Sequence, residues 1–308
     1  MSEHITHVAV YEDLVRLMNA ASDQFPEAFL ASTEKSYDSG LICSGARGNH
    51  LYAVPILEKY KNRKPESLGK KETEQIAGAI GWITHRASDL QMKPMFGILE
   101  ERNHPFFYDD ECQMFCDAIV FKEVYQGGKV LSESPYQAFS PATLAHGMKG
   151  NPAAEYMNVP MAENVFTHYF MKELVSLQQF IGDIDDINQY CDLLISNSQN
   201  LYENLRIYID AFQNPDPQKL IDYIYNFNVY DSQDSLIQIV RDIQLKNEYP
   251  ADSRLKEALE TSENQSQYAQ SLKMGYDFLF GAGQFYEGKI SKPEVYDVVQ
   301  NFNEAHRI

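Results

Sequence analysis

Apolar residues recur three or four positions apart along most of the chain, and strand-like alternation of apolar and polar residues is nearly absent. Near the N-terminus this spacing predicts a helix over about residues 4–21. Further helices are expected at about 26–32, 51–60, 72–91, 109–125, 161–180, 184–212, 217–226, 233–246, 253–260, 266–286 and 292–304. The pattern therefore predicts an all-α protein built as a multi-helix bundle.

The predicted helix over 72–91 differs from the others because its apolar residues point in several directions. A helix that is apolar on most sides is a central, buried one. Several of its residues are small enough for another helix to approach closely, namely Gly78, Ala79, Gly81 and Ala87. Because proline disfavours the helical interior, this helix is expected to end near Pro94.

Two segments and one change of composition suggest how the chain is organised. The glycines and small polar residues of 36–50 predict a loop that runs through the interior, and 129–159 is a second, longer irregular segment. After Gly182 no histidine appears until His306, and the helices become rich in Tyr, Asn, Gln and Asp. We therefore expect a helical domain over 1–182 and a helical C-terminal region over 183–308 packed on it, with one continuous domain as the alternative.

The chain has 308 residues and a net charge of −18. That charge argues against long nucleic acid as a partner, because the phosphate backbone would be repelled. No apolar run is long enough for a transmembrane segment, and no signal peptide is visible, so a cytoplasmic location is the default expectation. The four cysteines form no C-x-x-C pair, which argues against a thiolate zinc site.

His85 and Asp89 lie four positions apart on the predicted central helix and so share one face of it. An unpaired charge on a buried helix is costly. Two interpretations satisfy that constraint: a hydrogen-bonded His–Asp pair, or two ligands of one metal ion. The pair alone favours the hydrogen bond, and further ligands upstream would favour the metal.

Such ligands are present, because histidines and aspartates that can bind metals gather in the first 110 positions. They include His4, His7, Asp38, His50, His85, Asp89 and His104. Neutral imidazoles together with carboxylates suit zinc or a similar divalent ion. The chemistry that such a cage supports is hydrolysis, and two ions can flank an in-line attack at phosphorus.

The order of these residues resembles the zinc-dependent phospholipase C superfamily, which also holds single-strand-specific nucleases. The chain has an early His7, then Asp38 and His50 twelve positions later, then a G-x-x-x-H-x-x-x-D motif that ends with His85 and Asp89. The resemblance implies an all-α bundle of the phospholipase C or nuclease type, here with additional C-terminal helices. It implies that Asp38, His50, His85 and Asp89 hold one metal, with Asp89 bridging to a second metal held partly by His7. It also makes Asp38 the candidate to orient or deprotonate the attacking water.

The chain departs from the family pattern after Asp89, where the expected further histidine is missing. The ligands of a third site therefore stay open, with His104, His146 and His168 as spare candidates. We expect one to three zinc ions, with two favoured.

The hypothesis drawn from the sequence is a metal-dependent phosphoester hydrolase that uses metal-activated water on a small phosphoester or a phospholipid headgroup. Two alternatives remain. One is a catalytically degenerate helical protein that keeps one structural metal, which the missing histidine supports. The other is a metal-free helical interaction protein, in which His85 and Asp89 form only a hydrogen bond.

Overall fold

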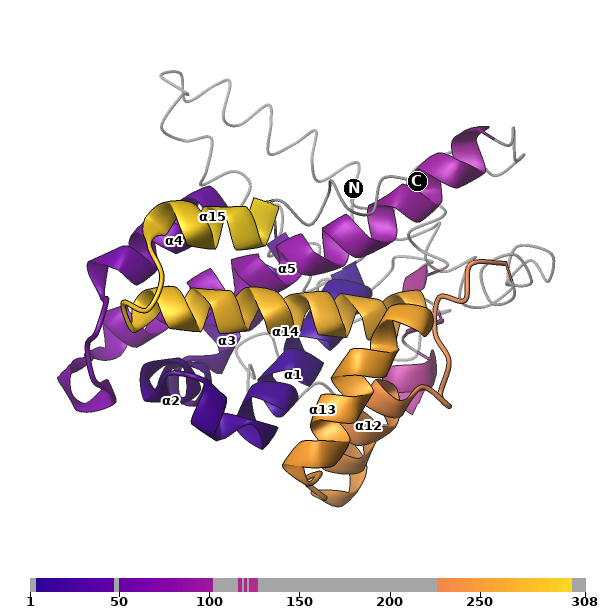
Figure 1. Ribbon diagram of the computed structural model, residues 1–308, viewed down its shortest axis with the longest axis horizontal. Coiled ribbons are helices and arrows are strands. Elements are labelled where there is room, and N and C mark those ends of the chain that lie inside the picture. Colours follow the sequence, from indigo (N-terminus) through magenta and orange to yellow (C-terminus); the bar gives the residue numbers. More distant parts are fainter. Residues whose placement is uncertain are drawn as a thin grey trace, which may run out of the picture.

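The protein is all-α in the part of the chain that the structure describes. The computed structural model describes residues 4–46, 50–101, 116–117, 119–120, 122–126 and 226–300, and no strand occurs among them. Figure 1 shows a bundle of helices in which α5 (Lys70–Glu101) and α14 (Gln267–Tyr286) are the two longest elements. The predicted all-α multi-helix architecture is confirmed.

Four helices precede α5. They are α1 (His4–Ala20), α2 (Glu27–Lys35), α3 (Tyr37–Ala46) and α4 (His50–Lys59), with short 3₁₀ turns at Ser22–Gln24 and Pro65–Ser67. Helices α1, α2 and α4 agree with the expected ranges within a few residues. Buried apolar side chains on nearly every side of α1 make it an interior helix.

The loop expected over 36–50 was wrong, because residues 37–46 form helix α3. Gly40 of this helix, like Gly78 and Gly81 of α5, serves close packing and not a turn. A Cβ on Gly81 of α5 would overlap the carbonyl oxygen of Gly40 in α3, and a Cβ on Gly40 would overlap the phenol of Tyr11 in α1. A Cβ on Gly78 would lie 3.1 Å from the Cys43 sulfur. The small residues of both helices therefore let α1, α3 and α5 approach one another at one crossing.

The expected end of the central helix near Pro94 was also wrong, since α5 continues through Pro94 to Glu101. A proline inside a helix removes one backbone donor and costs about 3 kcal/mol relative to alanine. The helix tolerates this cost because the preceding six turns are held by α1–α4 and α14, all of which pack on α5. The central position predicted for this helix is confirmed, since Ile76, Ile80 and Ile83 are fully buried.

The C-terminal part contains α12 (Ser235–Lys246), α13 (Asp252–Thr261), α14 and α15 (Lys292–Gln300), with a 3₁₀ turn at Ser262–Asn264. The first three agree closely with the expected ranges, and α15 begins where the helix at 292–304 was expected, while positions 301–304 lie outside the described residues. Local signals explain their ends: Asn247 stops α12 in the left-handed conformation, and the Ser266 hydroxyl accepts the Ala269 N–H at the start of α14.

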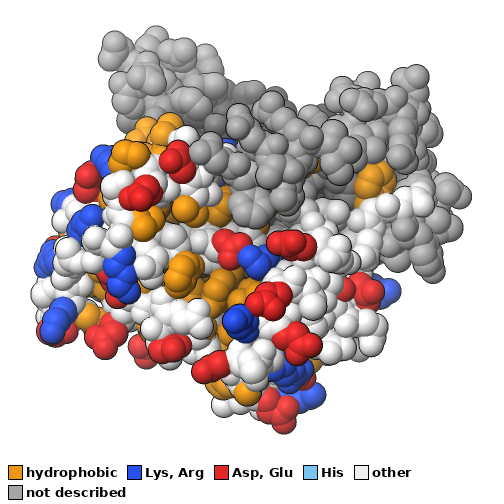
Figure 2. All heavy atoms as spheres, in the orientation of Figure 1, with side chains coloured by type: hydrophobic (Ala, Val, Ile, Leu, Met, Phe, Trp, Pro, Cys, Tyr) orange, Lys and Arg blue, Asp and Glu red, His pale blue; other side chains and the backbone are white. Residues whose placement is uncertain are grey.

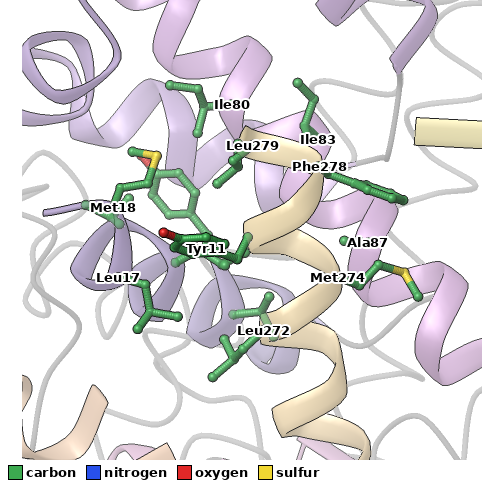
Figure 3. Close-up of a cluster of buried hydrophobic side chains, with 14 of the residues drawn as sticks. Tyr11, Leu17, Met18, Ile80, Ile83, Ala87, Leu272, Met274, Phe278 and Leu279 are labelled. Carbon is green, nitrogen blue, oxygen red and sulfur yellow. The ribbon is translucent and has the colours of Figure 1, made fainter. Parts of the chain in front are cut away.

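Helix α14 joins the C-terminal helices to the N-terminal ones by packing on α1 and α5. Figure 3 shows the cluster that results, in which Tyr11, Leu17 and Met18 of α1 meet side chains of α5 and α14. The contributions of the latter two helices are Ile80, Ile83 and Ala87, and Leu272, Met274, Phe278 and Leu279. The core is therefore built from segments that lie far apart in the sequence.

A buried group of charges, here called the Asp13 network, adds polar contacts to the same junction. The Asp13 carboxylate accepts from Arg16 Nη1 at 2.5 Å and from the Tyr268 hydroxyl at 2.7 Å, and its second oxygen also pairs with Arg241. Asp13 is fully buried. Both carboxylate oxygens are thus satisfied by side chains from α1, α12 and α14.

Acidic and basic side chains are interspersed over the coloured surface in Figure 2, so the excess of acidic residues forms no single patch on that face. None of the helices in the described part of the chain is both long enough and apolar enough to cross a membrane.

Several sequence-based expectations lie outside the described residues. These are the helices at 161–180 and 184–212, nearly all of 217–226, the irregular segment 129–159 and the domain boundary near 182. Of the helix expected at 109–125, the described positions from 116 to 124 are helical.

Candidate metal centre

Three of the side chains expected to bind metal lie together in the structure. His7 comes from α1, and His85 and Asp89 come from successive turns of α5. Each offers one ligand atom, and the three atoms all lie within 4.8 Å of one another. No other group of three such side chains is found in the described ranges, so these three residues, here called the His–Asp centre, are the candidate site.

The two histidines approach the carboxylate at separations that suit a shared metal ion. His7 Nε2 lies 3.3 Å from one Asp89 oxygen, and His85 Nε2 lies 3.4 Å from the other. Hydrogen bonds from nitrogen to oxygen usually span roughly 2.7–3.2 Å. Two ligands of one tetrahedral zinc, each about 2.0–2.1 Å from it, lie about 3.3–3.4 Å apart. The two contacts go to different oxygens of Asp89, and their lengths fit either long hydrogen bonds or ligands that share one ion.

The orientation of His85 is set by the backbone of α3. Its Nδ1 lies 2.5 Å from the Ser44 carbonyl oxygen, which can only accept, so Nδ1 carries the hydrogen. In a neutral ring, Nε2 then presents its lone pair toward Asp89. A backbone carbonyl that orients a histidine in this way is usual behind metal ligands.

His7 stacks on His85, with the ring centroids 3.8 Å apart and the planes 13° from parallel. Burial lowers the pKa of His7 to about 3, and the neighbouring His85 adds to this effect. His7 is therefore neutral at neutral pH. A neutral imidazole is the form that binds a metal.

Asp89 supplies the negative charge of the centre. Burial acts to raise its pKa, but its electrostatic interaction with His85 and its contacts with both histidines outweigh burial and hold the pKa well below the usual value. The carboxylate is thus ionised beside two nitrogen ligands. This donor set of two imidazoles and one carboxylate occurs in catalytic zinc sites.

The centre opens to solvent on one side. The side chains of His7 and His85 are 0% and 2% exposed, whereas Asp89 is 14% exposed. On that side Lys93, one turn further along α5, places its amine 2.6 Å from the Asp89 oxygen that faces His85, while its side chain is 53% exposed. Access to the centre is therefore along Asp89 and Lys93.

The structure places the other two expected ligands elsewhere. Asp38 lies half-buried in the first turn of α3, six residues before Ser44 and so about 9 Å away along that helix. His50 begins α4, with its Nε2 3.0 Å from the Gln300 amide nitrogen and its ring against Tyr296 of α15. Their roles as ligands, and that of Asp38 as a base, stay predictions.

The spare candidates His104, His146 and His168 lie outside the described residues. Two parts of the centre were missed from the sequence. The Ser44 carbonyl belongs to the backbone and has no sequence signal. Lys93 did have one, since it lies four positions after Asp89 and so on the same helix face.

Comparison of the chain with protein-family models, with curated proteins and with solved structures finds no match. The chemistry of the site is therefore argued from its own geometry.

Proposed function

We propose that His7, His85 and Asp89 bind a divalent metal ion, zinc by preference, and that the protein is a metal-dependent phosphoester hydrolase. One observation carries the proposal. Nδ1 of His85 lies 2.5 Å from the Ser44 carbonyl oxygen, so if the ring is neutral its Nε2 lone pair faces an Asp89 oxygen 3.4 Å away. Two acceptors at that distance repel each other unless a cation lies between them. A metal ion supplies that cation, and a proton on His85 is the competing explanation.

Each residue of the His–Asp centre has a defined part in this proposal. His7, which is neutral, and His85 would contribute nitrogen ligands, Asp89 contributes one negative charge, and Ser44 holds the His85 ring in place. An ion held by these groups would lower the pKa of water and stabilise negative charge on a phosphoryl oxygen. The family resemblance still makes Asp38 the predicted base, although the structure does not bring its side chain to the His–Asp centre.

Three protein ligands with a solvent-exposed side are typical of a catalytic zinc site, because structural sites usually use four. The resemblance to zinc-dependent phospholipases C supports phosphoesters as the substrate class, with a small phosphoester or a phospholipid headgroup as the candidates. One ion is what the described side chains support. A second ion would need ligands such as His50 or the spare histidines.

A second candidate function is a purely structural metal. It is favoured by the fact that the three ligands come from only two helices, α1 and α5, so one ion would fasten the N-terminal helix to the central one. A protein of this kind would keep the fold and the bound ion but would not hydrolyse a substrate.

The first test is elemental analysis of protein purified without added metal and without a histidine tag. We expect about one equivalent of zinc, lost in His85→Ala and in Asp89→Ala. His50→Ala is the matched control, since its ring packs against α15, and it should keep the ion. Wild-type protein that is metal-free and cannot be reloaded with zinc would favour the protonated His85 and the metal-free interaction protein.

The second test separates the two metal-bound functions. Zinc-loaded protein is screened against phosphodiesters and phosphomonoesters, with the Asp89→Ala variant as the blank. Turnover that disappears with the zinc supports the hydrolase, whereas a full zinc content without turnover of any phosphoester supports the structural ion.

A further inference from the structure

We propose that Lys93 is the residue that binds the anionic oxygens of the substrate at the entrance of the His–Asp centre. The inference rests on the proposed function, because it assigns the phosphate-binding group of that same site. It starts from the contact of the Lys93 amine with Asp89, which no other step of the proposed chemistry uses.

The position of the amine is fixed by the carboxylate beside it. The same Asp89 oxygen lies 3.4 Å from His85 Nε2 and 2.6 Å from Lys93 Nζ. The amine is therefore the immediate neighbour of the ligand atoms. Since Lys93 lies one turn after Asp89 on α5, the helix holds the stem of the side chain on the same face as both ligands.

A lysine amine carries three N–H donors and no acceptor. One donor is used by Asp89, and no further hydrogen bond of Lys93 occurs within the described part of the chain. The side chain is 53% exposed, so the remaining donors face the solvent side of the centre. A lysine with free donors beside a metal is suited to bind phosphate as a point charge.

The direction of access adds a second, independent reason. Because both histidines are buried and Asp89 is only slightly exposed, a substrate reaches the centre past Lys93. The chain as a whole carries a net charge of −18 and repels anions. The positive amine of Lys93 offsets that repulsion at the entrance to the centre. It therefore favours an anionic substrate, such as a phosphate ester, over a neutral one.

The test uses zinc-loaded full-length protein and inorganic phosphate as the probe, followed by isothermal titration calorimetry at constant ionic strength. The variant is Lys93→Gln, and Lys93→Arg retains the charge. Lys246→Gln is the matched control: Lys246 pairs with Asp242 at the same spacing, at 2.8 Å and with 58% exposure, but no histidine group lies beside it. Zinc content is measured for every sample.

We expect Lys93→Gln to weaken phosphate binding tenfold or more while keeping its zinc. Lys93→Arg should stay within about threefold of wild type, and Lys246→Gln should be unchanged. If zinc is fully bound and Lys93→Gln binds phosphate as tightly as wild type, or if wild type binds no phosphate, the inference is overturned and the metal centre stands. Zinc-free wild type overturns the proposed centre itself, and the role of Lys93 with it.

Discussion

Two buried polar clusters lie on the same helix, α1, and they are built in opposite ways. In the Asp13 network the carboxylate receives short hydrogen bonds, at 2.5 Å from Arg16 and 2.7 Å from Tyr268, and pairs with Arg241 as well. In the His–Asp centre, six residues earlier on α1, the histidine nitrogens stay 3.3 and 3.4 Å from Asp89. In the Asp13 network both carboxylate oxygens are paired at short distance, whereas in the His–Asp centre the histidines stay further from the carboxylate.

The difference teaches how buried charge can be assigned a role. A buried carboxylate whose two oxygens are both paired by side chains from several helices holds those helices together. In the His–Asp centre the histidine–carboxylate contacts are longer, and Asp89 receives its short contact, 2.6 Å, from the half-exposed Lys93 amine, so this cluster is the candidate for an additional cation. The two clusters should therefore respond differently to substitution and to zinc, and the predictions below use that contrast.

The largest effect is expected from Asp13→Ala. This substitution leaves the buried Arg16 and the partly buried Arg241 without their shared carboxylate, and breaking a buried pair costs about 3–5 kcal/mol. Urea unfolding should show this loss in the free energy of unfolding, equally with and without zinc. Asp242→Ala, which removes a surface carboxylate paired with Lys246 and Arg254, should cost far less. Equal losses in the two variants would show that the Asp13 network does not stabilise the fold.

The next effect is the stabilisation by zinc, which should depend on His85. A ligand at 100 times its dissociation constant adds about 2.7 kcal/mol to the free energy of unfolding. Wild type should gain this amount between chelator and zinc, and His85→Ala should gain none. Comparing each protein with itself removes the cost of the cavity that the substitution leaves. A gain in the variant equal to that of wild type would place the zinc elsewhere.

A smaller effect should follow from Gly81→Ala. Its new methyl group would overlap the Gly40 carbonyl in α3, and overpacking of this kind costs about 1–3 kcal/mol. Because α3 also carries Ser44, the shift should weaken zinc binding too. The control is Gly78→Ala on the same helix, whose Cβ would lie 3.1 Å from a side-chain sulfur. Thermal unfolding and zinc titration of both variants test whether Gly81→Ala lowers stability and zinc affinity more than Gly78→Ala does. A Gly81→Ala variant with normal zinc affinity would contradict the link through α3.

The smallest effect is expected from Tyr268→Phe. It removes one hydrogen bond to Asp13 while both arginines remain, so a loss of about 1.5 kcal/mol is expected. Zinc affinity should not change, because the Asp13 network and the His–Asp centre share no residue. Urea unfolding and zinc titration together check both statements. A loss of zinc affinity in this variant would mean that the two clusters are coupled through α1.

Much of the fold could be predicted from periodicity, since α1, α4, α12, α13 and α14 show the helical spacing clearly. The failures have physical causes. Helix α3 is rich in glycine and serine, which normally indicate a loop, and its close packing against α1 and α5 is a tertiary feature that local sequence does not show. The extension of α5 through Pro94 depends on the packing of the whole helix and not on the residues near the proline.

The candidate site could be predicted only in part, because local spacing reveals some of its contacts and not the long-range ones. His85 and Asp89 share a helix face, which spacing alone reveals, and His7 joins them in the structure after being named from the order of residues. The position of His50 against α15 depends on a contact 250 residues away, with Gln300, that no local pattern shows. The Asp13–Arg241 pair spans 228 residues and was not anticipated either.

The late position of α14 has a consequence for the synthesis of the chain. Helices α1 and α5 leave the ribosome long before residues 267–286 of α14 are made. In the folded protein, however, Gly275 of α14 lies against Leu14, and the Tyr268 hydroxyl donates a hydrogen bond to Asp13, 255 residues earlier. During that interval the nascent helices display the apolar side chains that Figure 3 shows in contact with α14. The growing chain should therefore depend on chaperones that shield apolar surface until its last helices emerge.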